Sequence, residues 1–187
     1  MYKDTKYKLT LVTVFFHWFI GLFILFMLAL GVYMTEFKDY SFYSLHKSIG
    51  AILLVFVILR IYWRFRNKFF EPITNQSVFL TRCAHGIQLL LLTMTLVMPI
   101  SGIGMSYFSG NGLKVFGVEI LARNIDEFGK KFPIDGNLAS LFHEVHHYGG
   151  YLFIALILIH FLAAIRHVFR KEKYLKRILG VKIADKS

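Results

Sequence analysis

The sequence predicts an all-α membrane protein with four transmembrane helices in a bundle. Of its 187 residues, 56% are hydrophobic, and the mean hydropathy is +0.55. Four apolar segments are each long enough to cross about 30 Å of hydrocarbon at about 1.5 Å per residue. Apolar segments at this density are typical of polytopic membrane proteins and not of soluble domains.

The four spans belong to a single predicted domain over residues 1–187. The first follows three lysines, as a signal peptide would, but it is longer than a signal core and lacks a small-residue cleavage site. Pro99 lies inside the third span, where we expect it to kink the helix. The predicted spans are 14–34, 45–65, 83–107 and 143–168.

The net charge of +11 is distributed according to topology. The N-terminus, residues 60–82 and residues 166–187 together carry 16 Lys/Arg and 4 Asp/Glu, whereas the rest of the chain carries 6 and 7. The positive-inside rule therefore predicts that both termini are cytoplasmic. Because the basic residues cluster between apolar segments, we expect lipid and not nucleic acid as their partner.

The connection 108–142 is long for so small a membrane protein. Its apolar residues lie at mixed spacing between Lys114 and Lys131. Two interpretations are open: a short amphipathic helix on the outer membrane surface, or an ordered loop without a helix.

Histidines lie at two depths in the predicted spans. His17 is near the cytoplasmic end of the first span, and His46 opens the second from the outer side. The fourth span begins with several outer histidines and reaches His160 toward the cytoplasm. Two pairs of imidazoles at two depths are what two stacked haems require, whereas zinc needs three or four ligands at one depth. The single cysteine, Cys83, excludes an intrachain disulfide and covalent haem attachment through C-x-x-C-H.

Helix geometry selects among the histidines of the fourth span. His146 and His160 are fourteen residues apart, so they share one face and lie about 21 Å apart along the axis. His143 lies about 100° around the helix from His160, His147 lies about 100° from His146, and His167 lies about 10 Å beyond His160. We therefore predict these three to be interfacial or close to propionates. By depth, the predicted metal ligands pair His46 with His146 on the outer side and His17 with His160 on the inner side.

The order and spacing of these segments resemble the bacterial four-helix cytochrome b561 family. The matching pieces are "FHW", "LHKSIG", "AHGIQ", "MPISG", "HEVHHYGGY" and "LIHFLAAIRHVF", from about residue 7 to "YLKRIL". The resemblance implies two b-type haems held by the same four histidines, with quinone as the electron partner. It also suggests superoxide or a periplasmic redox protein as donor. His147 departs from the family pattern, in which Glu usually follows the ligand.

Three basic residues and one histidine are further candidates for the site. Arg60 and Arg64 are candidates for binding haem propionates, or they anchor the topology. Lys47, the one candidate catalytic residue, would attract an anionic donor, bind a propionate, or reach the headgroups. His85 contacts a propionate or quinone, or faces the cytoplasmic interface. Gly21 and Gly50, each one turn after a predicted ligand, would let a macrocycle approach the backbone.

Three functions follow as hypotheses. The first is dihaem electron transfer across the bacterial inner membrane, between a periplasmic-side donor and the quinone pool, with superoxide oxidase as the type of enzyme. The second is a membrane-anchor cytochrome subunit that connects a soluble hydrogenase or dehydrogenase to quinone. The third, a haem-free transporter with a histidine relay, is disfavoured because the spans essentially lack Asp and Glu.

Overall fold

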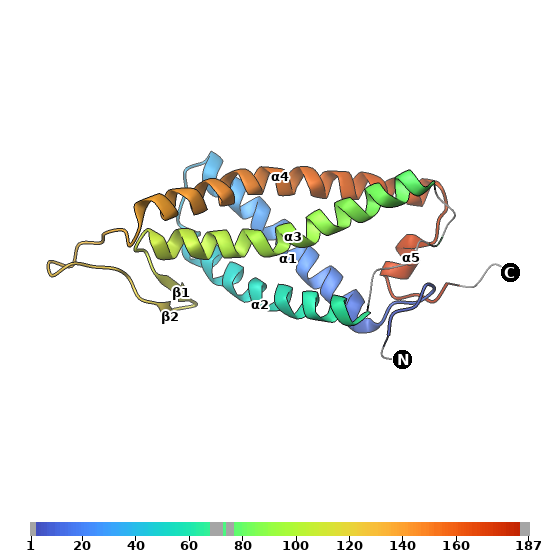
Figure 1. Ribbon diagram of the computed structural model, residues 1–187, viewed down its shortest axis with the longest axis horizontal. Helices are drawn as coiled ribbons and strands as arrows, with labels where there is room; N and C mark the ends of the chain where they lie inside the picture. The colour runs from blue at the N-terminus through green and yellow to red at the C-terminus, as the bar shows by residue number, and fades with distance from the viewer. Residues whose placement is uncertain (1–2, 68–72, 74–76, 184–187) are drawn as a thin grey trace.

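The computed structural model describes residues 3–67, 73 and 77–183 and confirms the four-helix bundle (Figure 1). Each of the four long helices is apolar and long enough to span a membrane, and each extends beyond the span predicted for it. They are α1 (Leu11–Glu36), α2 (Tyr43–Asn67), α3 (Val78–Phe108) and α4 (Gly136–Phe169); the short helix α5 is Tyr174–Ile178.

Side-chain caps fix where three of these helices begin. Thr10 accepts a hydrogen bond from the backbone of Thr13 at the start of α1, and Ser77 accepts one from Leu80 at the start of α3. At the start of α4, Asp135 accepts two backbone hydrogen bonds. Such caps satisfy N–H groups that have no partner within the helix. Pro99 lies inside α3, which changes direction along its length in Figure 1.

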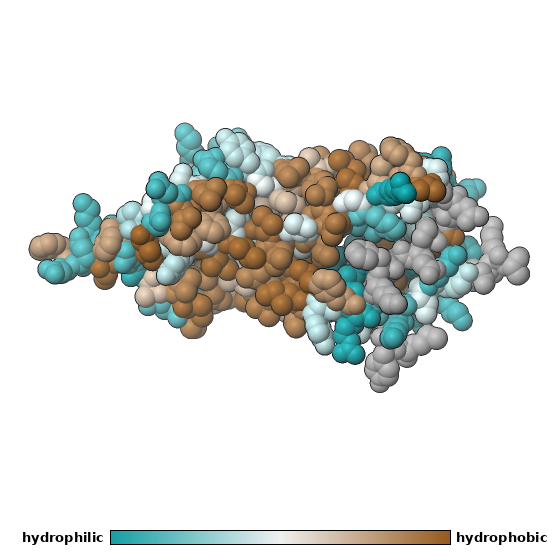
Figure 2. All heavy atoms as spheres, in the orientation of Figure 1, coloured by the Kyte–Doolittle hydropathy of each residue, from teal (hydrophilic) through white to brown (hydrophobic). Residues whose placement is uncertain are grey.

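The helices pack mainly on their neighbours in the chain. α1 packs on α2, α2 on α3, and α3 on α4, whereas α1 and α4 approach each other much less. The buried core runs through the bundle and contains Ile20, Ile24, Leu53, Val57, Met94, Phe153 and Leu156. On the face shown in Figure 2, apolar side chains cover the middle of the molecule and hydrophilic residues gather at both ends. This distribution matches a protein surrounded by lipid.

The two ends of the bundle differ in structure. We call the end that holds the α1–α2 and α3–α4 connections the loop end, and the end that holds α5 and both described chain termini the terminal end (Figure 1). At the terminal end, the Trp18 indole donates to the carbonyl of Ile178 at 3.1 Å, and the backbone N–H of Ile183 donates to Tyr7 at 3.0 Å. The buried Arg177 donates to the carbonyl of Lys6 at 3.0 Å. Both described termini therefore close the same end.

The connection between α3 and α4 forms a β-hairpin. Strands β1 (Leu113–Val115) and β2 (Val118–Leu121) are antiparallel. Their turn has positive φ angles of 47° at Phe116 and 90° at Gly117, which tight hairpin turns need. Residues 109–135, all of them described, contain no helix, so the amphipathic-helix interpretation was wrong and the ordered-loop interpretation is confirmed.

Candidate functional site

Two pairs of histidines face each other inside the bundle. Near the loop end, His46 of α2 and His146 of α4 have ring centroids 6.1 Å apart at an interplanar angle of 80°. Nearer the terminal end, His17 of α1 and His160 of α4 have centroids 6.4 Å apart at 57°. The structure thus brings together both pairs that helix depth and helix face predicted.

Both separations fit a metal ion between two imidazoles. An imidazole nitrogen binds a metal at about 2 Å, and the ring centroid lies about 1 Å further away, so two axial rings have centroids about 6 Å apart. The residues present therefore fit the bis-histidine iron of a haem at both depths.

Hydrogen bonds hold the ring of His146 in one orientation. Its Nδ1 lies 3.0 Å from the carbonyl oxygen of Met98 and 3.1 Å from the hydroxyl oxygen of Ser101. A carbonyl only accepts, so Nδ1 carries the proton and Nε2 keeps a free lone pair. This tautomer is the one that binds a metal through Nε2, with the other nitrogen fixed by its partner.

No pattern in the sequence predicted a role for Met98, Ser101 or Gly102. All three lie in "MPISG", the segment of α3 that packs against His146. A Cβ at Gly102 would lie 3.1 Å from Cε1 of His146, so a side chain there would push the ring. The small residues one turn from the proline were the available signal, but sequence alone did not say which helix they faced.

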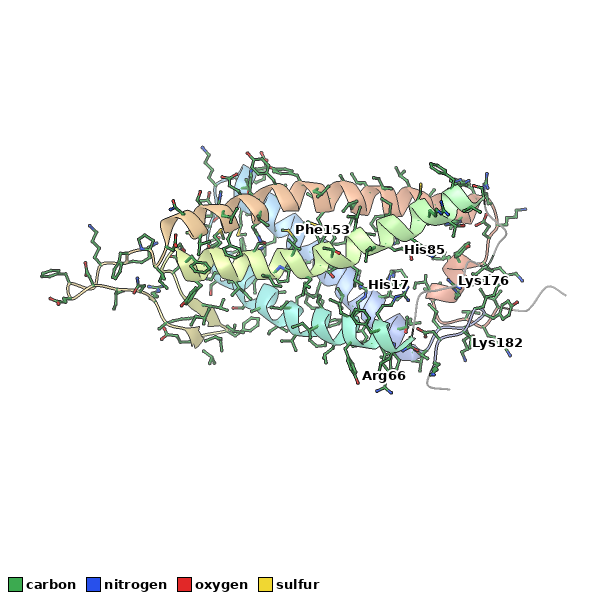
Figure 3. The ribbon with its side chains drawn as sticks, viewed as in Figure 1. His17, Arg66, His85, Phe153, Lys176 and Lys182 are labelled. Atoms are coloured by element: carbon green, nitrogen blue, oxygen red, sulfur yellow. The ribbon has the colours of Figure 1, made fainter. Side chains whose placement is uncertain are left out.

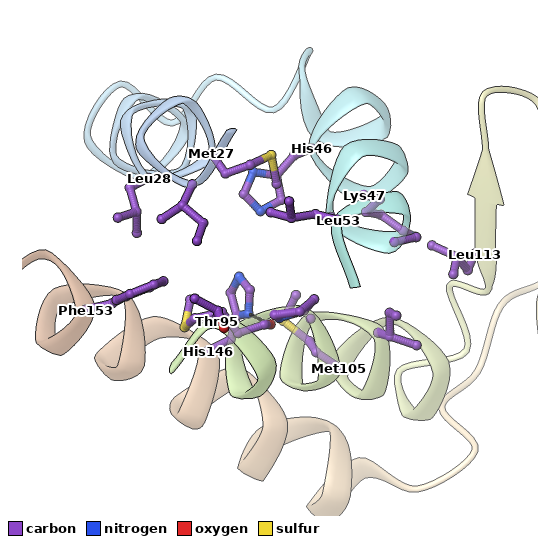
Figure 4. A pocket seen from close by; sticks show the side chains of 17 residues that line it. Met27, Leu28, His46, Lys47, Leu53, Thr95, Met105, Leu113, His146 and Phe153 are labelled. Carbon is purple, nitrogen blue, oxygen red and sulfur yellow. Dashed lines mark hydrogen bonds between the residues drawn. The ribbon is translucent and has the colours of Figure 1, made fainter. Parts of the chain in front are cut away.

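A cavity separates the rings of His46 and His146 (Figure 4). This cavity is lined almost entirely by apolar groups. Nδ1 of His46 is buried and has no hydrogen-bond partner among the described residues. All four long helices contribute to the wall, including Met27, Leu28, Leu53, Thr95, Met98, Met105 and Phe153. A flat apolar macrocycle suits such a wall.

Arg60 lies close to the terminal-end pair. Its positive charge acts on both His17 and His160. Among the described residues, no carboxylate forms an ion pair with Arg60. A half-buried guanidinium with no acidic partner among the described residues suits an anionic group such as a haem propionate. Arg64 differs, because the charge of Asp4 in the N-terminal segment reaches it, which suits an anchoring role at the terminal end.

Lys47 lines the loop-end cavity and contacts the connection between α3 and α4. Its Nζ donates to the carbonyl of Gly112 at 2.8 Å and lies over the ring of Tyr43. Arg123 and Lys131 are close enough for their charges to act on it. The sequence suggested Lys47 with a basic loop residue at this place, and the structure brings Lys47, Arg123 and Lys131 near one another.

The other histidines lie outside the two facing pairs. His167 binds Glu172 at 2.5 Å and packs on Tyr174, so it belongs to the terminal end. His143 and His147 stack on each other one turn apart on α4. His85 is half-buried in the terminal half of α3 (Figure 3).

The two glycines predicted to admit a macrocycle have open surroundings. A Cβ at Gly21 would meet no atom within 4 Å, and one at Gly50 would meet only Cε of Met27, at 3.5 Å. Neither glycine is closed in by a neighbouring backbone. The space beside both is therefore compatible with a bound group.

Four apolar helices that enclose one facing histidine pair near each end are typical of membrane cytochromes b. The chain belongs to the prokaryotic cytochrome b561 family, whose model matches residues 8–180. It is 26% identical over 190 residues to cytochrome b561 homolog 2 of Escherichia coli (strain K12), and the aligned region covers 98% of this chain and 97% of that relative. The chain is thus a bacterial membrane electron-transfer protein, and its family implies haem b.

Proposed function

We propose that the protein carries two b-type haems and passes electrons between a donor at the loop end and the quinone pool. His46 and His146 would hold one haem, and His17 and His160 the other. The observation that carries this proposal is the pair of ring separations, 6.1 and 6.4 Å, at two depths of one bundle. Fourteen residues of α4 place the two centres about 21 Å apart along the axis.

The haem, when bound, supplies the one-electron chemistry, and the protein sets its surroundings. Met98 and Ser101 orient His146 so that Nε2 points into the cavity. Arg60 would offset the negative charge of a haem propionate beside His17 and His160. The apolar wall keeps water away from the loop-end centre, and this favours the less charged state of the centre.

The central test is spectroscopic. Purified protein should show a reduced α-band of low-spin haem b, and a pyridine haemochrome assay should count two haems per chain. A folded preparation that transfers electrons without haem would contradict the proposal.

We place the loop end in the periplasm and both termini in the cytoplasm of the bacterial inner membrane. The support is the excess of basic residues on the terminal side, 16 against 4 acidic residues. Cysteine labelling at Lys130, with a reagent that does not cross the membrane, should succeed in intact spheroplasts. Labelling at Lys176 in the terminal-end helix α5 should fail there, and the reverse pattern would invert the orientation.

The basic residues near the loop-end cavity suit a small anionic donor such as superoxide. Lys47 would attract the anion, helped by Arg123 and Lys131. Lys47→Gln should slow haem reduction and weaken its ionic-strength dependence, with haem content unchanged. Lys47→Arg should keep the fast rate, and Lys114→Gln, at a lysine paired with Glu119, is the matched control. Equal rates for Lys47→Gln and the unmodified protein would exclude this role.

An apolar groove between α1 and α4 supports quinone as the electron partner. It is lined by Ala29, Val32 and Tyr33 of α1 and by Ile154, Ile157 and Phe161 of α4, among others. Leu28 lines both this groove and the loop-end cavity, so the two are adjacent. An isoprenoid tail entering from the lipid would fit such a surface.

Filling the groove tests the quinone site. Ala29→Trp should slow quinone reduction while haem reduction by the donor stays fast. Leu22→Trp, at an exposed position of the same helix, is the control. If both variants reduce quinone as fast as the unmodified protein, quinone binds elsewhere.

The second candidate function is a membrane anchor for a soluble redox enzyme. One observation favours it: the connection that follows the hairpin projects beyond the bundle, and Phe128 in it is 93% exposed (Figure 1). Purified protein that reduces quinone alone with superoxide would favour the first function. The anchor function would be favoured if the protein reduces quinone only together with a soluble partner enzyme, and if Phe128→Ser abolishes this coupled activity.

A further inference from the structure

Two histidines at the loop end of α4 lie outside both facing pairs. His143 and His147 are one helical turn apart, and their rings are nearly parallel, at 6°, with centroids 5.9 Å apart. With Glu144 they form the pattern H-E-x-x-H, in which two histidines on one face of a helix bind one metal ion. We propose that His143 and His147 form a binding site for a divalent transition-metal ion, separate from the haem sites.

This pair is separate from the candidate haem ligand that lies between the two in sequence. His146 faces α2 and α3 and is held by Met98 and Ser101. The side chain of His143 is 58% exposed, so an ion in solution reaches it. Four residues leave His143 and His147 about 40° apart around the helix, whereas His146 points about 60° away from His143 and about 100° away from His147. A metal ion can therefore bind this pair without displacing His146.

The surroundings keep both rings available for a metal. Among the described residues, no hydrogen bond occupies a ring nitrogen of His143 or His147; the nearest acidic oxygen, on Glu144, is 3.8 Å from Nδ1 of His143. The edge of Tyr151 packs against His147 at 5.3 Å and 88°, and Tyr148 lies against it at 5.2 Å. These two tyrosines limit the rotation of His147. The carboxylate of Glu144 favours a cation at this place.

The number of ligands decides which metal fits. The described residues contain no cluster of three or more His, Cys, Asp or Glu side chains placed to hold a metal. Zinc sites of the H-E-x-x-H type need a third protein ligand, so a hydrolytic zinc centre is not assigned. Copper(II) and nickel(II) accept two imidazoles with water in the remaining positions, and copper(II) binds such ligands most tightly.

The experiment is a metal titration of the full-length protein with its haems and without a polyhistidine tag. Calorimetry with Ni²⁺ should show one ion per chain. His143→Ala and His147→Ala should each weaken Ni²⁺ binding by about tenfold or more, because an ion held by one histidine binds the second from a high effective concentration, and either variant loses that gain. His85→Ala is the control and should bind Ni²⁺ as the unmodified protein does. Unchanged affinity in either His143→Ala or His147→Ala would overturn the proposal.

A second measurement keeps the proposal testable if a variant folds poorly. Electron paramagnetic resonance of the unmodified protein with one equivalent of Cu²⁺ should show coupling to two imidazole nitrogens, and coupling to fewer would overturn the proposal. The haem absorbance of His143→Ala and His147→Ala should match that of the unmodified protein. Loss of a haem in either variant would place that histidine in the haem site and would also overturn it.

Discussion

The two histidine pairs differ in what holds their rings. At the loop end, His146 is bound through Nδ1 by Met98 and Ser101, and Gly102 lies directly against it. At the terminal end, neither His17 nor His160 has a side-chain hydrogen bond among the described residues, and the nearby charge is that of Arg60. Hydrogen bonds and close packing therefore fix a ring at the loop-end centre, whereas a nearby positive charge acts on the terminal-end centre. Substitutions should affect the two ends differently.

Removing an axial histidine should have the largest effect and should separate the two centres. His146→Ala should reduce the haem count from two to one by emptying the loop-end site, and His160→Ala should empty the terminal-end site. A pyridine haemochrome count with a redox titration will identify the missing centre. His143→Ala should retain both haems. The assignment fails if His143→Ala loses a haem and His146→Ala does not.

Crowding the ring of His146 should damage the loop-end centre alone. A Cβ added at Gly102 would lie 3.1 Å from the ring, so Gly102→Val should destabilise the site by about 2 kcal/mol through overpacking. The expected result is a weakened or high-spin loop-end haem in the absorbance spectrum. Gly86→Val, in the same helix, is the matched control, because a Cβ there would meet nothing within 4 Å. A normal spectrum in Gly102→Val would show that packing does not set this centre.

Removing the charge of Arg60 should shift the terminal-end centre. Arg60→Gln takes away a positive charge that favours the reduced haem, and a loss of about 1 kcal/mol would lower the potential by roughly 40 mV. A spectroscopic redox titration measures the shift. Arg66→Gln, at an exposed arginine of the same helix, should change neither potential. A shift at the loop-end haem instead would reverse the assigned positions of the two centres.

Removing one of the two partners of His146 should have the smallest effect. In Ser101→Ala the Met98 carbonyl still accepts from Nδ1, so the loss should be about 1 kcal/mol or less. The loop-end haem should be retained with a slightly shifted potential. Ser106→Ala removes a buried hydroxyl of the same helix that binds Gly112, and should leave this potential unchanged. Complete loss of haem in Ser101→Ala would mean that the carbonyl alone cannot orient the ring.

The sequence predicted the parts of this protein that follow from periodicity and depth. The four spans came from hydropathy, and the pairing of His146 with His46 and of His160 with His17 came from helical rise and helix face. The β-hairpin was not predicted, because "GLKVFGVEIL" has neither a long alternating pattern nor a standard two-residue turn. Its turn is formed by Phe116 and Gly117, and phenylalanine seldom adopts positive φ.

Contacts between helices also could not be predicted from the sequence. The hydrogen bonds of His146 to Met98 and Ser101 depend on how α3 turns toward α4, which no pattern within one helix specifies. Arg60 and Arg64 are one turn apart and looked equivalent. Only the fold separates them, because it brings Asp4 of the N-terminal segment near Arg64 and leaves Arg60 beside the histidines.

The weak contact between α1 and α4 bears on how the protein is made. Each facing pair takes one histidine from the α1–α2 half of the chain and one from the α3–α4 half. Each half is a hairpin of neighbouring helices that can enter the membrane by itself. Because α2 packs on α3, the halves already meet on one side, and ligation would come last and close the other. Iron that bridges them would then act as an assembly checkpoint. A chain whose halves meet in the wrong register would stay open along this seam and remain accessible to membrane proteases.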